Sequence, residues 1–114
     1  MERVDGDFVE RTLEYMANVT PQCFTKLVAD LTTSSFSRDE RRIKRELILH
    51  YVGNITVIAA AGLDHAIPNR LLTDYHRMLR GFAECRGPLI NLSIDIPPQI
   101  DEAIELMRKP HLDT

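Results

Sequence analysis

The chain has 114 residues, of which 44% are hydrophobic and 27% are charged, and it carries a net charge of −3. These proportions are typical of folded globular proteins, so they exclude a disordered chain and predict a single helical domain over residues 1–114. The small negative charge gives no overall attraction to nucleic acid or to an anionic membrane, so either role requires a local basic patch.

The compartment is predicted from the N-terminus, the apolar runs and the cysteines. Residues 1–7 are charged and do not resemble a signal peptide, and the longest apolar run, residues 55–63, is too short to span a bilayer. Cys23 and Cys85 are expected to be buried free thiols rather than a disulfide. We therefore expect a cytoplasmic protein without a membrane segment.

Two helices are predicted in the first third of the chain. Apolar residues recur at helical spacing over residues 7–18, and this helix should end before Pro21. Thr20 can cap a second helix and Pro21 suits its first position. The apolar stripe of the second helix comprises Phe24, Leu27, Val28 and Leu31. The polar run at 32–35 then predicts a loop.

A long central helix is predicted to follow Ser37, which forms a capping-box pattern with Glu40. Its first turns are charged, whereas residues 47–63 are apolar almost all round, so this half must be covered by the bundle or by a partner. Gly53 is the weak point, because a glycine inside a helix costs about 1 kcal/mol relative to alanine. Both a break and a continuous helix remain open at this position.

The last third is predicted to hold a helix from Pro68 to the break at Gly87–Pro88, a strand over residues 90–96, and a final helix that begins at Pro97–Pro98. The fold class is therefore mostly all-α. We expect a compact bundle of about five helices, with a long central helix and one short extended segment before the last helix.

The strand is expected to need a partner for its hydrogen bonds, because its main-chain N–H and C=O groups are unpaired and the sequence offers no second strand. It can pair with the same strand of a second copy, pair with another protein, or pack on the bundle as an extended connector whose main chain is hydrated. The first alternative makes it the seam of a homodimer. The seam residues are then Ile90, Leu92, Ile94 and Ile96.

The alternation over residues 90–96, followed by Pro97 and an amphipathic helix, resembles the opening half of a ribbon-helix-helix DNA-binding domain. That resemblance implies pairing of two strands between subunits and reading of the major groove by Asn91, Ser93 and Asp95. It covers less than a fifth of the chain. The second helix of that fold has no counterpart, and Asp95 has the wrong charge to face phosphate.

A basic stripe is the first candidate site. Four arginines fall at i, i+3, i+4 and i+7 and share one helix face: Arg38, Arg41, Arg42 and Arg45. Guanidinium groups bind phosphates and carboxylates well, so the stripe is a candidate anion- or partner-binding surface. The competing interpretation is a solvated face whose charge is balanced by neighbouring acids.

Two further candidates lie on the same long helix. Gly53, Thr56 and Ala60 form a small-residue face for close helix packing, either inside the bundle or between subunits, and both alternatives predict burial. His50 could bind a metal together with Glu46, but no metal-binding motif is present, so a hydrogen-bonded histidine is the better interpretation.

These patterns predict a non-catalytic protein-binding adaptor or regulator, acting as a homodimer, with no metal and no cofactor. We find no nucleophile motif and no phosphate-binding glycine loop. The alternatives are a nucleic-acid-binding regulator that uses the arginine stripe, which is not favoured, and a small enzyme or metal protein around His50.

Overall fold

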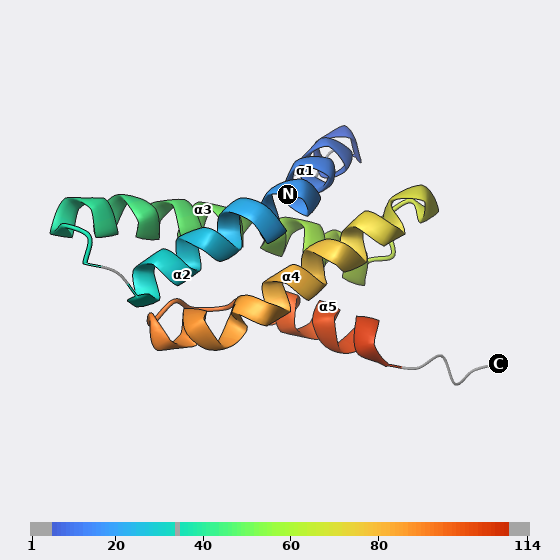
Figure 1. Cartoon of the computed structure of the whole chain (residues 1–114). Helices are drawn as coiled ribbons and strands as arrows, with labels where there is room; N and C mark the ends of the chain where they lie inside the picture. Colours follow the sequence, from blue (N-terminus) through green and yellow to red (C-terminus); the bar gives the residue numbers. More distant parts are fainter. Residues whose placement is uncertain (1–5, 34, 110–114) are drawn as a thin grey trace, which may run out of the picture.

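The computed structural model describes residues 6–33 and 35–109, and this part of the chain is helical with short connections (Figure 1). The α-helices are α1 (Gly6–Val19), α2 (Thr25–Thr33), α3 (Arg38–Leu63), α4 (Leu72–Asn91) and α5 (Pro98–Arg108). A π-helical turn, η1 (Thr20–Phe24), joins α1 to α2, and a 3₁₀ turn, η2 (Asn69–Leu71), precedes α4. The predicted all-α bundle is confirmed.

The first two helices are not separated as expected. The chain stays helical from Gly6 to Thr33, through the wider turn of η1, so the helix end predicted near Pro21 is wrong. A proline cannot donate the i→i−4 hydrogen bond, and a wide π-turn is one way in which a helix continues past such a defect. As a result α1 and α2 pack against both α3 and α4.

The long helix α3 begins with the predicted capping box. The Ser37 hydroxyl accepts a hydrogen bond from the Glu40 main-chain N–H at 3.2 Å, and the Glu40 carboxylate accepts one from the Ser37 N–H at 3.0 Å. The helix then runs without a break through Gly53 and ends at Leu63. It ends in a Schellman motif, in which His65 adopts a φ of 56°.

The predicted break at Gly87–Pro88 and the strand over residues 90–96 are both wrong. Helix α4 continues through Pro88 to Asn91 and also ends in a Schellman motif. Ser93, with a φ of 62°, donates its N–H to the Ile90 carbonyl, and Ile94 donates its N–H to the Leu89 carbonyl. The alternation of apolar residues comes from this helix end, because Ile94 and Leu89 are the apolar pair that typically accompanies the motif, and both are buried.

This result also removes the basis of the ribbon-helix-helix resemblance. Ile90 and Asn91 belong to a helix, and residues 92–97 form a short connection to α5. No strand occurs within residues 6–33 and 35–109.

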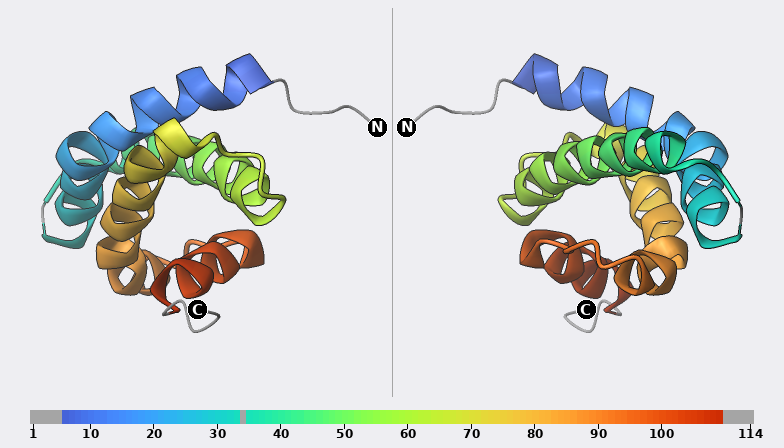
Figure 2. Two further views of the ribbon diagram at one scale, coloured as in Figure 1. Left: turned by 90° about the vertical axis from the view of Figure 1, so that its right-hand side faces the viewer. Right: turned by 90° about the vertical axis from the view of Figure 1, so that its left-hand side faces the viewer.

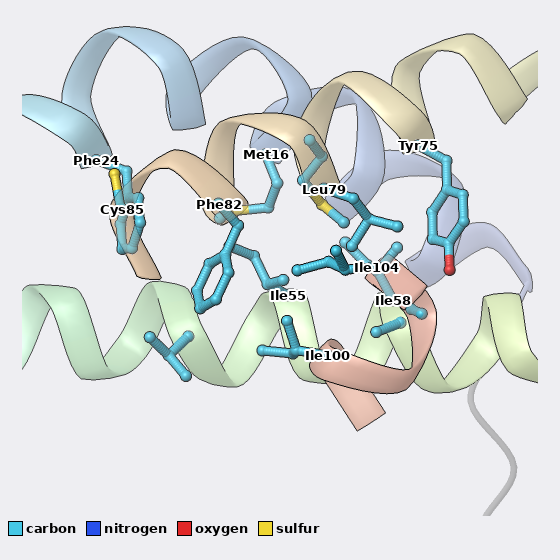
Figure 3. Close-up of a cluster of buried hydrophobic side chains, with 14 of the residues drawn as sticks. Met16, Phe24, Ile55, Ile58, Tyr75, Leu79, Phe82, Cys85, Ile100 and Ile104 are labelled. Carbon is cyan, nitrogen blue, oxygen red and sulfur yellow. The ribbon is translucent and has the colours of Figure 1, made fainter. Parts of the chain in front are cut away.

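The core lies between the helices, with α1 and α5 on opposite sides of the molecule (Figure 2). Figure 3 shows side chains from α1, α3, α4 and α5 meeting in one buried cluster, which includes Met16, Ile55, Phe82 and Ile104. The rings of Phe24 and Phe82 stack with centroids 5.8 Å apart. Burial of such aromatic pairs contributes strongly to stability, so they fix α4 against the segment that joins α1 and α2.

The two cysteines lie in different environments. Both are free, as expected, but only Cys85 is buried, whereas Cys23 is exposed. The expectation of two buried thiols is therefore wrong for Cys23. This residue lies in η1, and its neighbour Phe24 takes the buried position instead.

Candidate anion-binding site

The four arginines of the stripe lie in the first two turns of α3, beside the C-terminal ends of α2 and α4 (Figure 1). The capping box fixes the start of α3 at Ser37 and thereby sets which way each following side chain points. The spacing of the arginines places all four guanidinium groups on the side of α3 that faces these two helix ends.

The four arginines line one pocket. Together with two leucines, one from the end of α2 and one from the connection after α4, they line a pocket of about 210 Å³. The lining residues are Leu31, Arg38, Arg41, Arg42, Arg45 and Leu92. No acidic residue among those that the structure describes lines this pocket, and four arginines and two leucines form its wall.

Two of the arginines also hold the main chain in place. Arg41 donates a hydrogen bond to the Leu31 carbonyl at 3.1 Å. Arg45 donates one to the Leu92 carbonyl at 2.7 Å and another to the Ser93 carbonyl at 3.1 Å. These carbonyls lie at or just beyond helix ends, where intrahelical donors are lacking. Arg41 and Arg45 therefore fix the two pocket walls as well as contributing charge.

The other two arginines are solvent-exposed. Arg42 pairs with Glu46 at 3.4 Å and lies 4.0 Å from Asp39. Both contacts are exposed, and such pairs are worth little energetically. Arg38 makes no hydrogen bond or ion pair with any part of residues 6–33 and 35–109. Its side chain is thus available to a ligand in the pocket.

Two other acidic residues near the pocket, Glu40 and Asp30, make contacts outside it. Glu40 accepts from the Ser37 N–H, and this hydrogen bond lowers the pKa of its carboxyl group. Asp30 pairs with Lys26 and Lys44, each at 3.4 Å. Lys44 in turn lies 4.5 Å from the centre of the Phe36 ring. These contacts keep both acids away from the pocket and leave its positive charge largely uncompensated.

The chemistry available in the pocket is binding. Arginine stays protonated at every physiological pH, and leucine has no ionisable group, so the lining offers no general acid, base or nucleophile. Guanidinium groups donate several hydrogen bonds in a planar fork that matches carboxylate and phosphate oxygens. The arrangement therefore favours capture of an anion.

The residues predicted to form a dimer seam are scattered. Ile94 is buried in the core, while Leu92 and Ile96 are partly buried against it. Ile90 is 50% exposed on the last turn of α4. Leu92, which was assigned to the seam, lines the arginine pocket instead.

The small-residue face of α3 does not mediate close packing inside the bundle. A Cβ atom added at Gly53 would meet nothing within 4 Å, and Thr56 and Ala60 are only partly buried. The prediction that Gly53 would be buried is wrong for the single chain. The glycine that another element does approach closely is Gly62, which faces the phenol ring of Tyr75.

His50 lies on the exposed side of α3, where its ring is 3.5 Å from the side-chain nitrogen of Asn54. Among the described residues, no group of three or more His, Cys, Asp or Glu side chains is arranged to hold a metal ion.

Three large apolar side chains of α3 are exposed: Ile43 and Leu47 share the outer side of the helix, whereas Leu49 lies about 200° around the helix from Leu47. Ile43 is 53%, Leu47 44% and Leu49 46% exposed. By length and composition alone, α3 could cross a membrane, because the structure joins the short run at 55–63 to preceding apolar turns in one helix. Core helices of water-soluble proteins meet the same criterion.

Sequence reasoning found the four arginines and missed the two leucines of the pocket. Leu31 appears in the sequence only as the last member of the α2 stripe, and Leu92 was assigned to a strand. No local signal brings residues 31, 38–45 and 92 together, because their contact depends on how three helices pack. Comparisons with protein-family models, with curated proteins and with solved structures gave no match.

Proposed function

We propose that this chain is a non-catalytic, cytoplasmic adaptor or regulator that binds another protein and takes an anionic group of that partner in the arginine pocket. One observation carries the proposal: four arginines line a single pocket, and no acidic residue among the described ones lines it. Grouped like charges repel one another, so they are stabilised when an anion binds between them.

The pocket is also held in shape before any ligand arrives. The hydrogen bonds from Arg41 and Arg45 to main-chain carbonyls fix two of the four guanidinium groups. A site whose donors are already ordered loses less side-chain entropy on binding. This favours a specific docking point for one charged group over diffuse attraction to a polyanion.

The experiment compares two labelled peptide libraries with randomised flanking positions. One library has an anionic residue, either glutamate or phosphoserine, at its centre, and the other has serine. We expect fluorescence polarisation to show binding of the anionic library only, and Arg38→Ala to weaken it. Arg80→Ala removes the same charge from α4, away from the pocket, and serves as the matched control. Equal binding of both libraries contradicts the proposal.

We also propose that the chain self-associates as a homodimer, now through the outer side of α3 rather than through a strand. The support is the exposure of Ile43 and Leu47, which are four residues apart and share one side of α3. Contiguous exposed apolar patches often mark interaction surfaces. Analytical ultracentrifugation at micromolar concentration should give a dimer for the wild type and a monomer for Leu47→Glu. Leu106→Glu, at an exposed apolar position of α5, is the control, and a monomeric wild type rules out the dimer.

A nucleic-acid-binding regulator that uses the same arginines is the alternative. Its signature is affinity for an oligonucleotide that falls steeply with salt, because bound counterions are released. Binding of a single-stranded DNA 12-mer, together with failure to bind the anionic peptides, would replace the adaptor by this alternative.

A further inference from the structure

We propose that the group bound in the arginine pocket is a dianionic phosphate monoester, carried on a serine or threonine side chain of the partner protein. This inference rests on the proposed function and narrows it, because the adaptor role by itself is compatible with any anionic side chain. Size, charge and hydrogen-bond donors each contribute to the argument.

The size of the pocket points to an end group rather than a whole molecule. Its volume is about 210 Å³, whereas pockets that enclose complete small-molecule ligands measure roughly 300–1,000 Å³. A nucleotide or an organic cofactor exceeds this space. A compact charged group at the end of a side chain fits, with the rest of its chain lying outside.

The charge of the pocket matches a dianion better than a monoanion. Arg38, Arg41 and Arg45 have no carboxylate within ion-pair distance among residues 6–33 and 35–109, and only Arg42 has acidic neighbours. A phosphate monoester carries about −1.5 to −2 charges at neutral pH, whereas a carboxylate carries one. The three arginines without a carboxylate partner are therefore better balanced by a phosphate.

The donors that remain also suit a phosphate. Each guanidinium has five N–H donors, of which Arg41 uses one and Arg45 uses two on main-chain carbonyls. The remaining N–H groups of these side chains, together with those of Arg38, can satisfy three phosphate oxygens. Leu31 and Leu92 add apolar surface to the pocket lining, and a less polar surrounding strengthens charge-assisted hydrogen bonds.

The test uses four versions of one randomised peptide library, centred on phosphoserine, on its methyl diester, on glutamate or on serine. The methyl diester keeps the phosphorus and removes one negative charge, and in this respect it resembles the linkage of nucleic acids. We expect the phosphoserine library to bind about tenfold more tightly than the diester and glutamate libraries, a difference of about 1.4 kcal/mol.

Variants at Arg38 link this preference to the pocket. Arg38→Ala should weaken phosphoserine binding about tenfold, and Arg38→Lys should recover part of the loss, because lysine keeps the charge but not the planar fork. Arg80→Ala should have no effect. Because Arg38 has no partner in the described structure, these variants should unfold thermally like the wild type.

The outcomes separate this inference from the function on which it rests. Equal binding of the phosphoserine and glutamate libraries overturns the phosphate assignment and leaves the adaptor role in place. Equal binding of phosphoserine and its diester overturns the requirement for a dianion. Failure of every anionic library, with or without binding of a DNA 12-mer, overturns both proposals.

Discussion

The guanidinium of Arg45 donates a 2.7 Å hydrogen bond to the main-chain carbonyl of Leu92, which is 47 residues further along the chain. A second hydrogen bond, of 3.1 Å, reaches the Ser93 carbonyl. One side chain of α3 thereby holds the point at which α4 ends and the connection to α5 begins.

Arg45→Ala should therefore destabilise the fold although the residue is not in the apolar core. Loss of two charge-assisted hydrogen bonds, which leaves the Leu92 and Ser93 carbonyls without this donor, should lower the free energy of unfolding by about 2 kcal/mol. Urea denaturation measures the change. Arg42→Ala is the matched control, since Arg42 makes only exposed ion pairs, and similar losses in both variants would contradict the structural role of Arg45.

Replacing Ser93 by glycine should make the folded state more stable. Its φ of 62° lies in the left-handed region, which costs a non-glycine residue roughly 1 kcal/mol. Ser93→Gly should raise the midpoint of urea unfolding, because this cost is removed at the helix end. Ser93→Ala keeps the Cβ atom and should give no such increase. A glycine variant less stable than the wild type would show that the helix end differs from the Schellman motif.

Alanine substitutions at the two glycines of α3 should change the stability of the protein in opposite directions. At Gly62 an added Cβ would collide with the phenol ring of Tyr75, which is buried, so Gly62→Ala should destabilise by about 1–3 kcal/mol. At Gly53 nothing lies within 4 Å, so Gly53→Ala should stabilise by up to about 1 kcal/mol through helix propensity. Thermal unfolding followed by circular dichroism separates the two. If both substitutions stabilise the protein, or both destabilise it, this explanation is wrong.

The attachment of α5 to α4 should depend on pH. Arg86 donates two 2.8 Å hydrogen bonds to the Asp101 carboxylate, and these hydrogen bonds lower the pKa of Asp101. Because the folded-state pKa is depressed, the stabilisation is present above the unfolded-state pKa and is lost as the pH falls through the folded-state pKa. The pair is partly exposed, so the effect should be modest.

Asp101→Asn tests this pH dependence. The variant should be less stable than the wild type at neutral pH, and the difference should disappear at about pH 2.5, where carboxyl groups are protonated. Urea unfolding at both pH values provides the measurement. A difference that stays constant across this range would exclude the ion pair as its source.

The two thiols should react at different rates. Cys23 is exposed, whereas burial raises the pKa of Cys85 to about 11. Because the thiolate is the reactive form, the folded chain should take up one equivalent of iodoacetamide rapidly, and the second only after unfolding. Mass spectrometry counts the adducts, and Cys23→Ser should abolish the rapid phase. Rapid modification of Cys85 in that variant would contradict its burial.

The parts of the fold that could be predicted are those set by nearby residues. The Ser37–Glu40 capping box needs only a four-residue pattern, and the arginine stripe needs only helical spacing; the arginines indeed line one pocket. The same local reasoning failed for residues 90–96. There an alternation that is typical of a strand comes instead from a helix end with Ser93 in a left-handed conformation.

What could not be predicted depends on contacts between distant segments. The pattern around Arg45 does not reveal that its guanidinium reaches Leu92, because that contact requires α4 to continue past Pro88 and end beside α3. The pairing of Gly62 with Tyr75 is hidden for the same reason. Spacing within one helix identifies a shared face, whereas the packing of several helices determines what that face contacts.

The hydrogen bonds from Arg45 also bear on how copies of this chain could exchange parts. Domain swapping of a terminal helix requires the segment before it to open and cross to a neighbour. Here that segment is residues 92–97, and its first two carbonyls are held on α3. Opening it breaks these hydrogen bonds in addition to the contacts of α5 itself. These hydrogen bonds therefore raise the free energy needed to open the segment, and loss of the Arg45 side chain should lower it.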